Sequence, residues 1–307
     1  MSRRTDLRAR AGVARGPALV GGAGLAIIAN PSAGSKGADA MIDALAVDLP
    51  DAVVISAGAG PLEAAFSRAA GAAVLGVVGG DGTINAAAER ALATSLPLAV
   101  FPGGTLNHFA RDLGVDDEGA TVDALREGRL VGVDAGTIDS APFLNTASFG
   151  SYADFVDCRE RFESSIGKWA AAVVAAAYVL SRASAVRVEI NGEERRIWMI
   201  FIGNCAYEPP NLAPRSRPRL DDGFFDVRFV DDSRRGSRIR LLAALATGRL
   251  ARSKVYTRML VRSLEIHSLD GPLRLARDGE TFDGGRDVRV AKHPERLRVY
   301  APGSVSS

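Results

Sequence analysis

The sequence has few cysteines and few lysines, and each shortage disfavours a class of protein. Its two cysteines, Cys158 and Cys205, lack the spacing of a metal-binding or redox pair. A disulfide-stabilised extracellular fold is therefore not expected, and a reducing, cytoplasmic location is. Only four lysines occur, so arginine supplies most of the positive charge, and the net charge is only +2. This balance argues against a dedicated nucleic-acid-binding protein.

A long apolar run is also missing. The most apolar stretch, "WAAAVVAAAYVL" at 169–180, is shorter than the roughly 20 residues that a membrane-spanning helix needs. Residues 1–22 carry several arginines but are not followed by the apolar region of a signal peptide, so they are predicted to be a disordered basic tail. We expect a cytoplasmic protein and leave peripheral membrane association open.

The first half of the chain repeats one pattern. With 307 residues and 47% hydrophobic content, two domains are expected. Within 23–138, short apolar runs such as "LAIIA", "AAVLGVV" and "LAVF" alternate with glycine-rich turns and alanine-rich helical stretches. Continuous apolar strands separated by helices are typical of a buried parallel sheet. The pattern predicts a doubly wound α/β domain over 23–138.

After about residue 140 the pattern changes. Short strand-like segments dominate, including "AVRVEI", "RRIWMIFIG", "FFDVRFV", "KVYTRMLVRSLEIHS" and "RLRVYAP". The "NG" at Asn191 and Gly192 is a hairpin signal. Helices are predicted at 167–182 and, with many arginines, at 234–253. The fold class is therefore α/β plus β, with a second, β-rich domain over 139–307.

Three loops follow the predicted parallel strands of the first domain. They run from Asn30 to Gly34, from Gly79 to Thr83 and from Pro102 to Thr105. Ligands of doubly wound sheets bind at the carboxyl ends of the strands, where these loops meet. Neither the GxGxxG dinucleotide fingerprint nor the Walker lysine motif is present, which disfavours hydride transfer and P-loop chemistry. The carboxylate of Asp81 inside a phosphate-binding type of loop calls for a cation between it and any phosphate.

The motifs resemble those of a known family. "GGDGTIN" followed by "PGGTLNHFARDLG", with "NPSAG" before them and "VGVDAGTID", "RLDDGFFDV" and "RDGE" after them, resembles the diacylglycerol kinase catalytic-domain family, which includes bacterial lipid kinases and sphingosine kinases. The resemblance extends from about Leu25 to Pro302. It implies an N-terminal domain like that of NAD kinases and diacylglycerol kinases, followed by a C-terminal β-sandwich. The GGDGT motif alone is shared with NAD kinases.

The resemblance also implies an activity and its cofactors. The expected reaction is magnesium-dependent transfer of the γ-phosphate of ATP to a lipid hydroxyl, with a diacylglycerol-like acceptor. The positions that match nucleotide contacts of the family are Asn30, Pro31, Ser32, Ala33, Gly34, Ser56, Gly79, Gly80, Asp81, Gly82, Thr83, Ile84, Asn85 and Thr105.

Four positions match metal-binding residues of the family. Asp222 is expected to bind a structural magnesium ion together with the main-chain oxygens of Arg219 and Phe224, although a plain turn before the strand "FFDV" is an open alternative. Asp134 is expected to support the magnesium network of Asp81, and a simple cap of a strand end is the alternative.

The catalytic assignment comes from "RDGE". The resemblance makes Asp278 the base that accepts the proton of the lipid hydroxyl, with Glu280 supporting magnesium. A tight Asp-Gly hairpin turn is the alternative reading of the same residues. His108 lacks partners at catalytic spacing and is interpreted as a local polar contact.

Two other functions are kept open. An NAD kinase would share the GGDGT loop, and a non-catalytic nucleotide-binding or lipid-binding protein would keep the loop without the chemistry. The expected partner is a lipid substrate at a membrane surface, with no nucleic acid and with a homodimer left open. The sequence does not identify the acceptor lipid.

Overall fold

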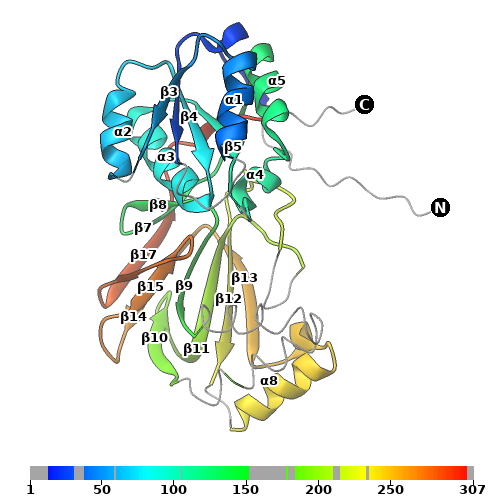
Figure 1. Cartoon of the computed structure of the whole chain (residues 1–307). Helices are drawn as coiled ribbons and strands as arrows, with labels where there is room; N and C mark the ends of the chain where they lie inside the picture. Colours follow the sequence, from blue (N-terminus) through cyan, green and yellow to red (C-terminus); the bar gives the residue numbers. More distant parts are fainter. Residues whose placement is uncertain are drawn as a thin grey trace, which may run out of the picture. The chain divides into compact units, whose positions relative to one another are not determined.

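The chain folds into two compact units. The computed structural model describes residues 13–30, 38–58, 60–104, 106–151, 178, 184–209, 215–232 and 235–302 (Figure 1). The first unit comprises Met1–Ala135, Arg217–Asp222 and His293–Ser307, and the second comprises Gly136–Ser216 and Gly223–Lys292. The helix predicted at 167–182 lies almost entirely outside the described residues.

The first unit contains a seven-stranded sheet with the order β1-β6-β18-β5-β4-β2-β3. Strands β3, β2, β4, β5 and β18 run parallel to one another, whereas β6 is antiparallel to both of its neighbours, β18 and β1. The bounds are β1 Val13–Arg15, β2 Leu25–Ala29, β3 Val53–Ser56, β4 Val74–Gly79, β5 Leu98–Pro102, β6 Arg129–Val133 and β18 Leu297–Tyr300. Strands β2 and β4 are buried along their whole length, as the continuous apolar runs predicted.

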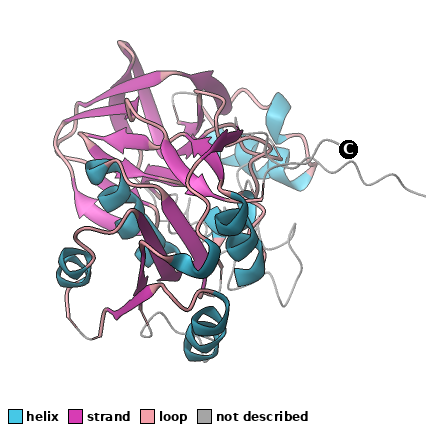
Figure 2. Ribbon diagram, turned by 90° about the horizontal axis from the view of Figure 1, so that it is seen from above, coloured by secondary structure: helices cyan, strands magenta, loops and turns pink. Residues whose placement is uncertain are grey.

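Helices cover both faces of this sheet (Figures 1 and 2). Leucines of α1 and α5 join the core on one face, while α2 and α3 pack together beside the same strands. The bounds are η1 Val20–Gly22, α1 Ala38–Asp48, α2 Leu62–Arg68, α3 Asp81–Thr94, α4 His108–Asp112 and α5 Glu118–Glu127. The predicted doubly wound α/β fold is confirmed.

The two ends of the chain differ from the prediction. The segment "RLRVYAP", expected in the β-rich domain, forms β18 and pairs with β5 and β6 of the first unit. Residues 13–15, expected in a disordered tail, form β1 against β6, and Gly16 N–H donates to Gly128 O (2.8 Å). The two segments also contact each other, since Tyr300 Oη donates to Pro17 O (2.8 Å). The first unit therefore extends beyond the continuous range of 23–138.

The second unit is an eleven-stranded sheet whose inner faces enclose one apolar core. Its main order is β16-β15-β9-β11-β10-β14-β17-β7-β8, and β12 pairs with β11 and β13. The bounds are β7 Gly136–Ile138, β8 Ala141–Phe143, β9 Thr146–Gly150, β10 Val186–Ile190, β11 Glu193–Asn204, β12 Phe225–Asp231, β13 Tyr256–Val261, β14 Ser263–Ser268, β15 Arg274–Arg277, β16 Glu280–Asp283 and β17 Asp287–Lys292.

Two sequence segments of this unit fold differently from the prediction. The run "KVYTRMLVRSLEIHS" was expected to be one strand but divides into β13 and β14 at Arg262. The basic helix predicted over 234–253 is shorter and consists of α8, Ser237–Ala246, and the 3-10 turn η3, Leu250–Arg252. A glycine at 248 with φ of 67° separates the two pieces, a conformation that ordinary side chains rarely adopt.

Candidate functional site

Three loops of the first unit meet at the carboxyl ends of neighbouring strands. Asn30 follows β2, Gly80 follows β4 and Gly103 follows β5, and these strands are adjacent in the sheet. Asn30 N–H donates to Val78 O (3.1 Å), and Gly103 N–H donates to Gly79 O (3.0 Å). The backbone itself therefore holds the loops together at the edge where doubly wound folds bind ligands.

Facing glycines allow the second and third loops to touch. A Cβ atom on Gly104 would lie 2.5 Å from Gly80 Cα, which no side chain could tolerate without moving the backbone. Asn107 fixes this turn because its Oδ1 accepts Gly104 N–H (3.0 Å) and its Nδ2 donates to Gly104 O (2.7 Å). The sequence "PGGTLN" thus has a local structural reason for its second glycine and its asparagine.

Helix α3 begins directly at this contact. Gly80 is its N-cap and offers no side chain, and Asp81 is the first helical residue. Among the described residues, no hydrogen bond takes up the N–H groups of Asp81, Gly82 or Thr83. Free N–H groups and the positive end of the helix dipole make such a helix start an anion-binding site. Asp81 Oδ1 accepts a long hydrogen bond from Phe109 N–H (3.5 Å).

Polar side chains surround the start of α3. Asn30 Nδ2 donates to Thr83 Oγ1 (3.1 Å), and Thr83 is buried. Asn85 Oδ1 is buried and has no hydrogen-bond partner in the described part of the chain. Ser56 is exposed at the end of the edge strand β3, where its carbonyl accepts from Arg68 (2.6 Å). The predicted nucleotide-contacting residues Pro31, Ser32, Ala33, Gly34 and Thr105 lie outside the described residues.

A carboxylate pair lies elsewhere in the first unit. Carboxylate oxygens of Asp134 and Asp222 lie within 4.8 Å of each other. Asp134 is buried, its N–H donates to Leu220 O (2.7 Å), and its Oδ1 accepts from Arg296 Nε (3.1 Å). The structure thus places Asp134 beside the "RLDD" segment, 88 residues further along the chain.

The other two predicted metal ligands of this segment are the main-chain oxygens of Arg219 and Phe224. The Arg219 guanidinium pairs with Asp221 (3.0 Å), which leaves only its main-chain oxygen for a metal role. Phe224 belongs to the second unit, where its carbonyl accepts Cys205 N–H (2.9 Å). A carbonyl oxygen has two lone pairs, so this hydrogen bond leaves capacity for a cation.

Asp278 occupies the tight hairpin that its sequence allowed. Arg277 pairs with Glu280 across the β15–β16 ladder, and the two turn residues Asp278 and Gly279 have φ of 47° and 92°. This is the backbone of an Asp-Gly turn with two left-handed residues. Glu280 is exposed at the start of β16.

The Asp278 carboxylate is also clamped by backbone far away in the sequence. Oδ2 accepts Leu144 N–H (2.7 Å), while Oδ1 accepts the N–H groups of Asn145 and Thr146 (2.8 Å each). In return, Asp278 N–H donates to Thr146 O (2.8 Å). Three N–H donors stabilise the ionised form and fix the direction of the carboxylate. A turn alone would not need this clamp.

Residues that the sequence did not single out hold this clamp in place. Asn204 Nδ2 donates to Leu144 O (2.9 Å), and Asn204 N–H donates to Asn145 O (2.9 Å). Lys292 Nζ in turn donates to Asn204 Oδ1 (2.6 Å) and lies 4.5 Å from the centre of the Phe225 ring. A polar asparagine at the end of the apolar strand "IWMIFIGN" was the one sequence signal for this network.

A buried charge cluster lies on the outer side of β12. Asp226 accepts from Arg228 (2.6 Å), Arg258 (2.8 Å) and Tyr207 N–H (2.9 Å). Burial alone would raise the pKa of Asp226, but these hydrogen bonds outweigh it and hold the pKa below its usual value. Burial raises the pKa of the neighbouring Tyr256 to about 12. The cluster fixes the chain at Tyr207, whose Oη donates to Asn145 O (3.2 Å), so Tyr207 connects the cluster to the clamp around Asp278.

His108 makes a local contact, as expected: its Nδ1 lies 3.1 Å from Arg111 Nη2.

Within the described residues, no helix is long and apolar enough to cross a membrane.

Comparisons with known proteins agree with these motifs. Residues 24–138 match the diacylglycerol kinase catalytic domain, and residues 153–301 match the YegS C-terminal NAD kinase beta sandwich-like domain. A Pseudomonas aeruginosa protein named "Probable lipid kinase YegS-like" is 31% identical over 76% of this chain and 78% of its own length. A diacylglycerol kinase of Staphylococcus saprophyticus is 25% identical over 80% of this chain and 82% of its own.

Solved structures show the same fold. A diacylglycerol kinase from Bacillus anthracis has a TM-score of 0.62 at 18% identity and covers 90% of this chain and 96% of its own. An NAD kinase from Archaeoglobus fulgidus, solved in complex with ATP, has a TM-score of 0.54 at 12% identity and covers 91% of this chain and 94% of its own. The match to the diacylglycerol kinase catalytic domain, together with a relative that is 31% identical over most of both chains, shows that the chain belongs to the diacylglycerol kinase catalytic-domain family.

Proposed function

We propose that this protein transfers the γ-phosphate of ATP to the hydroxyl of a diacylglycerol-like lipid in a magnesium-dependent reaction. The observation that carries the proposal is the start of α3, where three N–H groups have no hydrogen-bond partner among the described residues and lie beside the carboxylate of Asp81. Phosphate oxygens fit the N–H groups. The carboxylate fits only if a cation accompanies the phosphates.

The residues around α3 suit a nucleotide. The N–H groups of residues 81–83 would bind phosphate oxygens, and the buried, unpartnered Oδ1 of Asn85 would accept a hydroxyl or amino group of the nucleotide. The Asn30–Thr83 hydrogen bond fixes the first loop against the second. Ser56 and the loop residues 31–34 and 105 stay proposed contacts from the family motif.

Magnesium would neutralise the charge that develops on the transferred phosphoryl group. Asp81 is the side chain that would hold it beside the phosphates. The sequence assigned Asp134 to the magnesium network of Asp81, but a carboxylate oxygen of Asp134 lies within 4.8 Å of one of Asp222. We therefore assign Asp134 to a second, structural ion, which Asp222 would hold with the main-chain oxygens of Arg219 and Phe224. Oxygen donors of this kind are the ones that magnesium prefers.

Asp278 is the proposed acceptor of the proton that the lipid hydroxyl loses. A base must keep a fixed direction toward the proton that it removes, and the three N–H donors of residues 144–146 supply that direction. Glu280, exposed beside it, is proposed to support the magnesium ion. The hairpin geometry and the catalytic role are compatible, because the turn presents the carboxylate.

The test is phosphate transfer from γ-labelled ATP into a total lipid extract, with NAD offered in a parallel reaction. Label in a lipid product, absent when Asp81 is replaced by asparagine, is expected. The rate should fall by on the order of 10²- to 10³-fold in that variant while the melting temperature is unchanged. Label in NAD alone would support the NAD kinase alternative, and no transfer to either would support a non-catalytic binding protein.

A further inference from the structure

The charge of the second unit is strongly divided along the sequence. Over residues 233–264 the chain has nine arginines and lysines and no aspartate or glutamate, although the whole protein is nearly neutral. This stretch contains α8, η3 and β13. Among the described residues, no ion pair involves Arg235, Arg240, Arg249, Arg252 or Lys254, and all five are exposed.

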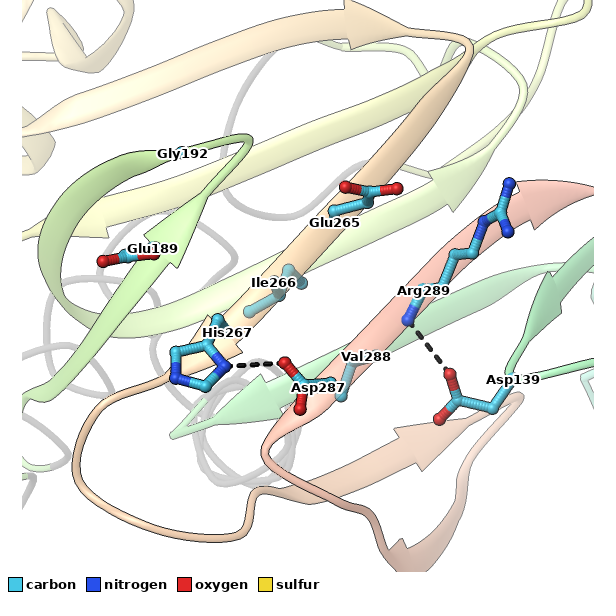
Figure 3. A pocket seen from close by; sticks show the side chains of 9 residues that line it. All are labelled: Asp139, Glu189, Gly192, Glu265, Ile266, His267, Asp287, Val288 and Arg289. Atoms are coloured by element: carbon cyan, nitrogen blue, oxygen red, sulfur yellow. Dashed lines mark hydrogen bonds and ion pairs between the residues drawn. The ribbon is translucent and has the colours of Figure 1, made fainter.

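The opposite charge gathers on another part of the same unit. A pocket over β10, β14 and β17 is lined by four carboxylates and by two basic residues, His267 and Arg289 (Figure 3). Its His267 Nδ1 lies 2.6 Å from Asp287 Oδ1. Positive and negative charges are therefore gathered on separate parts of this unit rather than mixed over its surface.

Helix α8 is unusual because its outward side is also apolar. Ser237, Leu241 and Ala244 are buried, and Leu241 and Ala244 pack in one apolar cluster with Trp198. The outward stripe at 239, 243 and 246 consists of Ile239, Ala243 and Ala246, all exposed, with Ile239 at 74%. A helix that simply covers a core normally has polar residues on that side.

We propose that α8 and η3 form a docking surface for an anionic lipid bilayer, with Ile239 entering the interface and Arg240, Arg249, Arg252 and Lys254 binding lipid headgroups. An apolar stripe flanked by arginines is the pattern of helices that lie in the plane of a membrane interface. Symmetric pairing of this surface with the same surface of a second copy fits poorly, because it would place arginines against arginines. The proposal rests on the proposed function, which requires a lipid acceptor.

This surface lies away from the Asp278 clamp within the same unit. The buried side of α8 packs in one cluster with Met199 in the middle of β11, whereas the clamp is held by Asn204, the last residue of this strand. Five residues of strand span about 17 Å. Changes on α8 should therefore alter membrane binding without altering chemistry on a dispersed acceptor.

The experiment measures sedimentation with phosphatidylglycerol-containing vesicles and with neutral phosphatidylcholine vesicles. The double variant Arg240→Gln/Arg249→Gln is compared with Arg274→Gln/Arg286→Gln, which removes the same charge from exposed positions on other loops and strands of the unit. We expect the α8 variant to bind anionic vesicles about 30-fold more weakly and the control to bind like the wild type. Ile239→Gln should weaken binding about tenfold with an unchanged melting temperature.

Each result has a defined meaning. Equal binding of the wild type to neutral and anionic vesicles, or equal loss in both double variants, would overturn the proposal. Stronger binding to RNA than to vesicles, lost in the α8 variant, would also overturn it. Because sedimentation needs no catalysis, vesicle binding without phosphate transfer would refute the proposed function and leave the docking surface standing. Full phosphate transfer together with unaffected vesicle binding in the α8 variants would refute the docking surface and leave the proposed function standing.

Discussion

Replacing Asp278 by asparagine should destabilise the second unit, because the carboxylate has a structural duty as well as its proposed chemical one. Both oxygens of Asp278 accept N–H groups, from Leu144 on one side and from Asn145 and Thr146 on the other. A carboxamide has only one accepting oxygen. If that oxygen takes the place of Oδ1, the new NH₂ group faces Leu144 N–H.

The magnitude follows from this count. Leu144 is buried, at 2% exposure, and a buried donor left without an acceptor costs about 1–3 kcal/mol. The two remaining hydrogen bonds change from charge-assisted to neutral, which costs on the order of 1 kcal/mol more. The free energy of unfolding should fall by about 2–4 kcal/mol, which corresponds to a fall in melting temperature of about 4–16 °C.

Thermal unfolding followed by circular dichroism measures this directly. The matched control is Asp283→Asn, an exposed residue of the same hairpin, which should stay within about 0.5 kcal/mol of the wild type. A melting temperature of Asp278→Asn equal to that of the control would refute the clamp. The activity of this variant should therefore be compared with that of the wild type at a temperature well below the melting temperature of the variant.

Four further changes test other parts of the structure. Gly104→Ala should lower stability by about 1–3 kcal/mol, because its Cβ would lie 2.5 Å from the Gly80 backbone, whereas Gly80→Ala, with 3.5 Å to its nearest neighbour, should cost under about 1 kcal/mol; equal costs would contradict the contact. Lys292→Met should lower kcat about 10- to 100-fold with an unchanged KM for ATP, and Lys292→Arg should restore part of it; a change confined to KM would argue against a positioning role. The depressed pKa of Asp226 contributes stability at neutral pH that is lost as the pH falls below about 4, so urea titrations should show a shallower acid limb in Asp226→Asn, and parallel limbs would disprove this. In Asp222→Ala, added magnesium should no longer raise the melting temperature; retained stabilisation would favour a plain turn.

The first unit was largely predictable from its sequence, for a physical reason. Buried parallel strands are apolar along their whole length, so the runs "LAIIA" and "AAVLGVV" identify buried strands from sequence alone. The glycine-rich loops then lie at the ends of these strands. The partner of a strand is not encoded locally. The segment "RLRVYAP" has the same alternating pattern as the strands of the β-rich unit, yet Val299 pairs with Leu98 across most of the chain.

The clamp around Asp278 could not be predicted because its donors are main-chain N–H groups. Any residue type at 144–146 supplies an N–H group, so the sequence has no signal for it. The Arg219–Asp221 ion pair was missed for a related reason, since a resemblance assigns a main-chain role and says nothing about the side chain. Glycine contacts, in contrast, were visible in outline, because PGGT and GGDGT both demand close backbone approach.

The proposed role of Asp278 in phosphate transfer is tested most directly by measuring nucleotide binding and phosphate transfer separately in Asp278→Asn. ATP affinity and single-turnover transfer to a dispersed diacylglycerol are measured at a temperature at which the variant is fully folded. We expect near-normal ATP affinity with transfer at least ~10²-fold slower, because the proposed nucleotide residues lie in the first unit and the proposed base lies in the second. Loss of ATP binding with an unchanged maximal rate would contradict this expectation and would assign Asp278 to the nucleotide site.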